Sequence, residues 1–300
     1  MNTQARISHD QRQLLVIVGP NRSGTTWLNQ LLQAHREICG VDRGETRLFL
    51  SIDHIWRNFS MEGSSDRGSI RTMLAGPMRS FCDELLDGAR ARSARPHALF
   101  FVEKTPGTAL FLPMLRYLYP DAWYIHIFRD GRDVIRSMQR HGYAMKNELV
   151  NSYSWARQEY YAEKFLAGFE RVIHIRYEDL HSDPLGVVLA IYEQLGLSRY
   201  PGLASEIANR SCEAVALYSH ESSVGTGKWR RDVTRRRLAV MYVGLGDQLV
   251  KYGYLDAREL AHWHWRPEYW LAIMRRELIR CGIAGKPAVR LFRIVGKPTY

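Results

Sequence analysis

Five apolar residues in a row, Leu14–Val18, run directly into a loop bracketed by Gly19 and Gly24. An uninterrupted apolar run of this length is typical of a buried parallel strand. After the loop, apolar residues recur at helical spacing, at Trp27, Leu28, Leu31 and Leu32. In a strand, glycine loop and helix of this kind, the loop amides and the positive end of the helix point at one anion. This stretch therefore predicts an α/β fold with an anion-binding loop.

The loop matches the first part of a Walker A sequence, G-x-x-x-x-G, but Thr25 stands where that motif has lysine. A nucleoside triphosphatase uses this lysine against the β- and γ-phosphates. Here the cation lies inside the loop, at Arg22. The loop is therefore expected to hold a less highly charged donor than a triphosphate. An ordinary strand–turn–helix with incidental glycines is the alternative that the loop alone leaves open.

Four further apolar segments are expected to be strands, over residues 38–41, 99–102, 123–128 and 172–176. Residues 147–168 predict a long helix, and residues 70–91 a helix broken at Gly76-Pro77. Strands that alternate with helices predict a P-loop-like three-layer α/β fold, with a mostly five-stranded parallel sheet and helices on both faces.

Composition narrows the class of partner. The chain of 300 residues carries 42 basic and 31 acidic residues, a net charge of +11, which favours anionic partners. No nucleic-acid-binding motif accompanies the charge, so nucleic acid is not expected. No apolar run approaches the ~20 residues of a membrane span, and the polar residues 1–12 lack the apolar centre of a signal peptide. The four cysteines show no metal or disulfide spacing, so reduced thiols and a cytoplasmic location are expected.

Charged clusters follow the predicted strands. They are Arg43-Gly44-Glu45-Thr46-Arg47, Glu103-Lys104-Thr105-Pro106, Arg129-Asp130-Gly131-Arg132-Asp133 with Ser137, and Tyr177-Glu178-Asp179-Leu180. A glycine-rich basic stretch, Gly225-Thr226-Gly227-Lys228-Trp229-Arg230-Arg231, comes later. Because parallel strands end at one edge of a sheet, the clusters are expected to surround the glycine loop.

This set of motifs resembles the sulfotransferases that use 3′-phosphoadenosine 5′-phosphosulfate (PAPS). The resemblance runs from about Leu14 to Trp229 and lies in short motifs, of which R-S-G-T-T-W and R-D-x-R-D-x-x-x-S are the most specific. It implies that the 5′-phosphosulfate is held by Arg22, Ser23, Gly24, Thr25, Thr26 and Trp27. It also implies that Arg129 and Ser137 bind the 3′-phosphate, that Tyr177 touches the adenine, and that Lys228, Trp229 and Arg230 close over the donor.

The resemblance also implies the catalytic residues. Glu45 lies where glycan and tyrosylprotein sulfotransferases place a glutamate base, and Lys104 and Arg22 are the expected catalytic cations. Glu103 is ambiguous, since it could orient Lys104 or be the base itself. A solvated Glu45 paired with a neighbouring arginine is the structural alternative. No metal is expected.

The acceptor is expected to be a hydroxyl on a carbohydrate or glycolipid, from the E-K-T-P turn and the position of Glu45. A tyrosyl or other small hydroxyl is the second choice, from Gly44-Glu45-Thr46-Arg47. A P-loop nucleotide kinase and a basic polyanion-binding module are the less favoured alternatives.

Residues 1–255 are expected to form the sulfotransferase domain, and residues 256–300 a basic aromatic extension. Packing of this extension on its own domain or at a homodimer interface is preferred over peripheral contact with a membrane. His262 and His264 lack further ligands and are not interpreted as a metal site.

Overall fold

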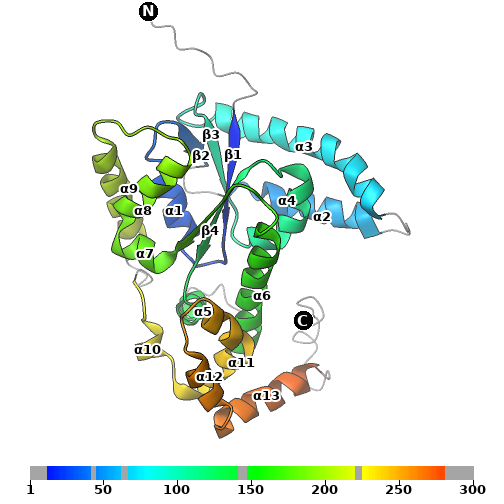
Figure 1. Cartoon of the computed structure of the whole chain (residues 1–300), viewed down its shortest axis with the longest axis vertical. Coiled ribbons are helices and arrows are strands. Elements are labelled where there is room, and N and C mark those ends of the chain that lie inside the picture. Colours follow the sequence, from blue (N-terminus) through cyan, green and yellow to red (C-terminus); the bar gives the residue numbers. More distant parts are fainter. Residues whose placement is uncertain (1–11, 42–44, 62–66, 141–146, 220–224, 281–300) are drawn as a thin grey trace, which may run out of the picture. The chain divides into compact units, whose positions relative to one another are not determined.

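Five parallel strands form one sheet in the order β2-β3-β1-β4-β5 (Figure 1). The strands are β1 (Gln13–Val18), β2 (Ile38–Gly40), β3 (Phe100–Lys104), β4 (Trp123–Phe128) and β5 (Val172–Arg176). The structure is a computed structural model that describes residues 12–41, 45–61, 67–140, 147–219 and 225–280. All five predicted strands and the parallel sheet are confirmed.

The chain divides into two units, which are described separately. Unit 1 comprises Met1–Phe128 and Tyr161–Ser222, and unit 2 comprises Arg129–Tyr160 and Ser223–Tyr300. The helices that precede β5 are α1 (Thr25–Leu32), α2 (Leu48–Met61), α3 (Arg67–Ala91), the 3₁₀ helix η2 (Thr108–Phe111), α4 (Leu112–Leu118), α5 (Gly131–Arg140) and α6 (Glu148–Leu166). Those that follow it are α7 (Tyr177–Ser182), α8 (Pro184–Gln194), α9 (Leu203–Ser219), α10 (Trp229–Asp232), α11 (Arg235–Lys251), α12 (Ala257–Trp263) and α13 (Pro267–Arg280).

In unit 1 the sheet lies between two apolar layers. Leu15 and Ile17 of β1 belong to a core cluster with residues of α1, α7, α8 and α9. Val16 and Val18 point the other way, into a cluster with residues of α2, α3, α4 and the last part of α6. Both faces of β1 are therefore buried, which explains its uninterrupted apolar sequence and confirms the three-layer α/β fold.

The crossovers place a topological switch at the end of β1. The connection from β1 to β2 uses α1, on one face, whereas the connections from β2 to β3 and from β3 to β4 use helices on the other face. Right-handed crossovers require this change of face, because the chain moves in one direction from β1 to β2 and back in the opposite direction afterwards. Open α/β sheets bind ligands beside such a switch, at the carboxyl ends of the strands.

The helix predicted to break at Gly76-Pro77 is continuous, so that prediction was wrong. α3 runs from Arg67 to Ala91 with Pro77 inside it. A proline removes one backbone hydrogen bond, but a long helix that packs on neighbours along its length can absorb this loss. Cys82 and Leu86 of α3 are buried in the core cluster, which fixes the helix beyond the proline.

Unit 2 has an apolar core of its own. Val134 and Ile135 of α5, Trp155 of α6, residues of α11, and Leu260 and Trp263 of α12 form one buried cluster. Both α12 and α13 pack against α11. The boundary expected at residue 255 stays a prediction.

No helix in the described part of the chain combines the length and the apolar character that a membrane crossing requires. Of the four cysteines, Cys39, Cys82 and Cys212 form no disulfide. Cys281 lies outside the described residues.

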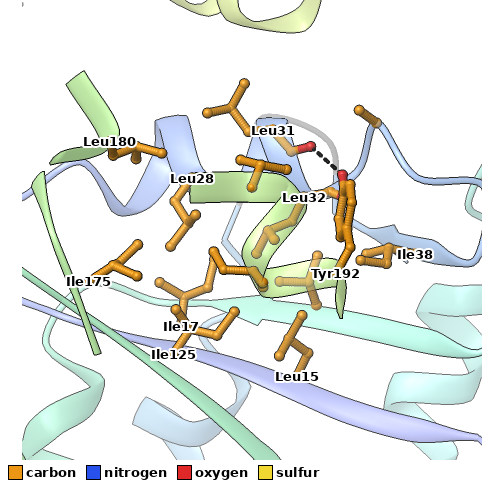
Figure 2. Close-up of a cluster of buried hydrophobic side chains, with 14 of the residues drawn as sticks. Leu15, Ile17, Leu28, Leu31, Leu32, Ile38, Ile125, Ile175, Leu180 and Tyr192 are labelled. Carbon is orange, nitrogen blue, oxygen red and sulfur yellow. Dashed lines mark hydrogen bonds between the residues drawn. The ribbon is translucent and has the colours of Figure 1, made fainter. Parts of the chain in front are cut away.

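Tyr192 of α8 ties two helices together through its hydroxyl group, as Figure 2 shows for its bond with Leu31. The hydroxyl oxygen lies 2.9 Å from the Leu31 carbonyl oxygen and 3.1 Å from that of Leu32, and it accepts a 3.2 Å bond from the His35 amide. Tyr192 is 1% exposed. The C-terminal end of α1 is therefore anchored to α8.

We expect Tyr192→Phe to lower the free energy of unfolding by about 1–3 kcal/mol, because the His35 amide and the end of α1 lose a buried partner. Urea denaturation measures the change. Tyr117→Phe, at an exposed tyrosine of α4, is the control and should change stability little. Equal stability of the Tyr192 variant and the wild type would contradict the anchoring role.

Candidate active site

The loop after β1 has two residues with left-handed backbone conformation. Arg22 has φ 71° and Gly24 has φ 92°. A Cβ atom on Gly24 would lie 2.6 Å from Cδ2 of Tyr177, so the loop packs against that ring only because residue 24 is glycine. A Cβ atom on Gly19 would lie 2.6 Å from the Ile127 carbonyl oxygen of β4. The two glycines are thus required by close packing as well as by the backbone.

Polar groups of this loop are buried without hydrogen-bond partners in the described part of the chain. They are Ser23 Oγ and Trp27 Nε1. Ser23 is fully buried, and Trp27 is 8% exposed. Buried polar groups normally have partners, so these two donors fit a site for a ligand with several oxygen acceptors. The structure brings all six predicted loop residues, from Arg22 to Trp27, onto this loop and the first turn of α1.

Tyr177, at the start of α7, is a core residue. It is 3% exposed and belongs to the same apolar cluster as α1. Its ring lies edge-on to that of Trp27, with a centroid distance of 6.0 Å. Tyr177 therefore packs against the glycine loop from the apolar core, and its contact with adenine stays a prediction.

Glu45 and Lys104 form an ion pair close to the loop. Lys104 is the last residue of β3 and pairs in register with Ile17 of β1, two residues before Gly19. Its Nζ atom lies 3.5 Å from Oε1 of Glu45, and the side chains are 3% and 30% exposed, respectively. Burial lowers the pKa of Lys104, and the neighbouring Glu45 carboxylate opposes this shift. The pair thus presents a partly open carboxylate beside a buried cation.

Arg47 contacts the same carboxylate. Its Nε atom donates to Oε2 of Glu45 at 3.3 Å, with the arginine side chain 71% exposed. Gly44, which precedes Glu45 in the predicted motif, lies outside the described residues.

Glu103 is completely buried and holds the segment that contains Thr46 and Arg47 in place. Its Oε1 atom accepts hydrogen bonds from Thr46 Oγ1 at 2.6 Å and Thr105 Oγ1 at 2.7 Å. Thr105 Oγ1 in turn accepts a 3.2 Å bond from the Arg47 amide. Burial raises the pKa of Glu103, while the two threonine bonds oppose the shift. Glu103 is therefore closed off from solvent, whereas the Glu45 side chain is 30% exposed.

Sequence reasoning missed Thr46 and Thr105. Their hydroxyl groups connect the segment after β2 to the turn after β3 through one carboxylate. Both threonines stand next to predicted site residues, but a threonine near a glutamate has no specific meaning until the fold brings them together.

Unit 2 holds the other group of predicted residues. Arg129 is 4% exposed and donates from Nη2 to the Gly225 carbonyl oxygen at 2.8 Å. Asp133 accepts hydrogen bonds from the amides of Gly227, at 2.6 Å, and Trp229, at 2.8 Å. The start of α5 is thereby joined to the glycine-rich stretch before α10.

Trp229 anchors this stretch. The guanidinium groups of Arg132 and Arg230 both contact its ring, at 3.9 Å and 4.8 Å from the ring centroid. Its Nε1 atom donates to Asp130 Oδ2 at 3.1 Å, and the same oxygen accepts from Arg132. Contacts with Asp130, Arg132 and Asp133 therefore hold the glycine-rich stretch in place, although the sequence pointed mainly to Arg129.

Positive charge gathers around Lys228. Its pKa is lowered by partial burial and by the nearby charges of Arg136, Arg129 and Arg231. Ser137, two turns into α5, is buried. Such a cluster of cations with a buried hydroxyl fits an anionic ligand. The structure thus brings Arg129, Ser137, Lys228, Trp229 and Arg230 into one unit.

Comparison with known proteins indicates the family to which the chain is related. The model of a family described as "Sulfotransferase family" matches residues 15–201, more than half of the chain. A putative protein-tyrosine sulfotransferase of Caenorhabditis briggsae is 35% identical over 130 residues, which cover 42% of each chain. Human protein-tyrosine sulfotransferase 1 is 28% identical over 148 residues, covering 48% of this chain and 39% of the human protein. The chain thus spans about half or less of the length of these curated relatives.

Among solved structures, the sulfotransferase domain from the olefin synthase of Synechococcus PCC 7002 has a TM-score of 0.54. It is 17% identical and covers 84% of this chain and 98% of that domain. This likeness confirms the fold.

We expect the stability of the Glu103→Gln variant to depend on pH differently from that of the wild type. Because the folded-state pKa of Glu103 lies above the ordinary carboxyl value of about 4.3, ionisation costs stability as the pH rises through and above that value. Glutamine does not ionise, so the variant lacks this loss. Relative to the variant, the wild type should therefore lose unfolding free energy between about pH 4 and pH 7.

Urea denaturation at both pH values measures the difference. Glu193→Gln, at an exposed residue of α8, is the matched control and should track the wild type. If the difference in unfolding free energy between wild type and Glu103→Gln were the same at both pH values, the burial of this carboxylate would have no electrostatic cost.

Proposed function

The chain belongs to the sulfotransferase family, and we propose that it transfers the sulfuryl group of PAPS to an acceptor hydroxyl, releasing adenosine 3′,5′-bisphosphate. The observation that carries the proposal is the Glu45–Lys104 pair, a carboxylate and a cation held beside an anion-binding loop. A base and a cation are the two groups that sulfuryl transfer requires of the enzyme.

The glycine loop fits the phosphosulfate end of the donor. Its backbone amides, the start of α1 and the buried Ser23 hydroxyl supply hydrogen bonds for phosphate oxygens. Arg22 supplies the positive charge that a Walker A loop takes from lysine. The hydroxyl groups of Thr25 and Thr26 complete the set.

The cation cluster of unit 2 fits the 3′-phosphate. Arg129, Ser137, Lys228 and Arg230 are the residues that we assign to it. A guanidinium group suits this role because its planar fork meets two phosphate oxygens at once. In this proposal Trp229 holds the glycine-rich stretch in place, with its ring in contact with Arg132 and Arg230.

The proposed step forms a bond between the acceptor oxygen and sulfur while the bond from sulfur to the 5′-phosphate oxygen breaks. Glu45 takes the proton from the acceptor hydroxyl as the new bond forms. Lys104 and Arg22 stabilise the negative charge that gathers on the departing phosphate and on the transferred sulfate. Glu103 takes no part in proton transfer; it fixes Thr46, and with it the adjacent Glu45.

A tyrosyl hydroxyl is the acceptor that we propose, in place of the carbohydrate or glycolipid expected first from the sequence. The curated relatives described above are named protein-tyrosine sulfotransferases. The segment Glu45-Thr46-Arg47, which resembles a motif of the tyrosylprotein enzymes, lies at the ion pair. A carbohydrate hydroxyl is the alternative outcome of the acceptor test.

A nucleotide kinase is the second candidate, since the loop has the Walker A spacing. Thr25 in place of the lysine opposes it, because a triphosphate would lack its usual cation. We therefore propose PAPS rather than ATP as the donor, with no metal in the transfer.

We expect adenosine 3′,5′-bisphosphate to raise the thermal unfolding midpoint, and ATP with magnesium to raise it much less. Arg22→Ala should weaken binding of the bisphosphate about 10- to 100-fold, because it removes a charge-assisted phosphate contact. Calorimetric titration measures the affinity. Arg36→Ala, at an exposed arginine of unit 1, should bind like the wild type. Tighter binding of ATP than of the bisphosphate would favour the kinase.

We expect labelled sulfate to pass from PAPS to a tyrosyl peptide, and Glu45→Gln to reduce the turnover number about 100-fold or more while donor affinity stays unchanged. Carbohydrate hydroxyls and simple phenols are assayed in parallel. Transfer to carbohydrate alone would reject the tyrosyl acceptor but keep the enzyme class. A fully active Glu45→Gln together with an inactive Glu103→Gln would show that the wrong carboxylate has been assigned as base.

A further inference from the structure

The C-terminal helix α13 packs on its own unit with one side only. Ala272 is buried, and Tyr269 packs against the apolar core of unit 2, to which α11 and α12 contribute. Trp263 of α12 is buried in the same core, and its ring contacts Tyr242 of α11 with a centroid distance of 5.1 Å. The packing of α13 is thus accounted for without the opposite side of the helix.

The opposite side is apolar and exposed. Trp270, Leu271 and Met274 are 56%, 53% and 58% exposed, and their spacing places them on one face of the helix. Trp265, just before the helix, is 86% exposed. We call these four residues the α13 face. Single exposed apolar residues are common, but two tryptophans, a leucine and a methionine together mark an interaction surface.

The charge of this region selects the partner. Residues 225–300 contain 16 lysine and arginine residues but only 6 aspartate and glutamate residues. This excess of basic residues accounts for most of the net charge of +11 of the whole chain. Exposed cations lie on α13 and on helices α11 and α12 of the same unit: Arg235, Arg236, Lys251, Arg258 and Arg275. Two copies of such a region would repel each other, whereas an anionic surface would attract it.

The chemistry of the face is that of a membrane interface. Tryptophan is enriched where one end of the ring is apolar and the other end meets water. The Trp270 Nε1 atom already donates to the His264 carbonyl oxygen at 2.7 Å, so the exposed part of this ring is its apolar edge. An amphipathic helix with basic surroundings lies in the plane of a bilayer, with its apolar side chains among the acyl chains.

We propose that the α13 face docks this protein on the surface of a bilayer that contains anionic lipid. The exposed tryptophans, Leu271 and Met274 enter the interface, and the surrounding arginines and lysines meet the lipid phosphates. This inference does not depend on the proposed transfer activity.

The test is co-sedimentation of the full chain with vesicles. Wild-type protein should bind vesicles that contain phosphatidylserine, should bind pure phosphatidylcholine vesicles much less, and should be released by salt. Leu271→Ser with Met274→Ser should weaken binding about tenfold or more, because two apolar side chains leave the interface. Arg275→Gln should weaken binding about fivefold, and only to the anionic vesicles.

The matched control is Met73→Ser with Leu85→Ser, which changes two exposed apolar residues of α3 in unit 1 and should leave vesicle binding unchanged. Thermal unfolding confirms that each variant is folded. Failure of the wild type to bind either vesicle, or equal binding by the α13 double variant, would overturn the proposal. A dimer in solution that dissociates in the α13 double variant, without vesicle binding, would overturn it in favour of a second copy.

Discussion

The change of face at the end of β1 determines where this protein can hold a ligand. α1 leaves the sheet on one side and the helices before β3 and β4 lie on the other, so no crossover covers the point where β1 ends. The loop that starts there must pass close to β4 and to the ring of Tyr177, which requires Gly19 and Gly24. The Tyr192 hydroxyl anchors the other end of α1, at Leu31 and Leu32. The geometry of the loop that we propose to bind phosphate is therefore a consequence of how the sheet is connected.

Burial gives the two carboxylates beside this loop different tasks. Glu103 lies inside the protein, and its carboxylate accepts hydrogen bonds from two threonine hydroxyl groups, which connects the segment after β2 to the turn after β3. Glu45, which lies before α2 in the sequence, remains partly exposed to solvent beside Lys104. In a protein interior, a charge without a partner is energetically unfavourable. The Glu45 carboxylate offsets this unfavourable free energy for the buried Lys104 ammonium group. Through Thr46, Glu103 thus holds the segment that carries Glu45 in place.

The parts of the fold that the sequence predicted are those determined by local patterns. Leu14–Val18 and the other apolar runs are buried on both faces of the sheet, and this alone makes them recognisable as strands. The continuity of α3 through Pro77 and the threonine bonds of Glu103 depend on tertiary packing, which no local pattern contains. Asp133 is an intermediate case. Its position in R-D-x-R-D was visible, but its bonds to the amides of Gly227 and Trp229 join segments that are 94 and 96 residues apart.

The Glu45–Lys104 pair also bears on the choice between sulfate and phosphate transfer. A kinase loop keeps a lysine for the doubly charged terminal phosphate and adds a divalent cation. Here the cation near the loop is shared with a carboxylate at 3.5 Å, which offsets its charge and would repel a doubly charged group. A sulfuryl group carries one negative charge, so a cation already paired with a carboxylate is sufficient for it. In the proposed reaction, the same carboxylate that makes a terminal phosphate unfavourable is the base for the acceptor hydroxyl, so one pair of side chains would link donor choice and proton transfer.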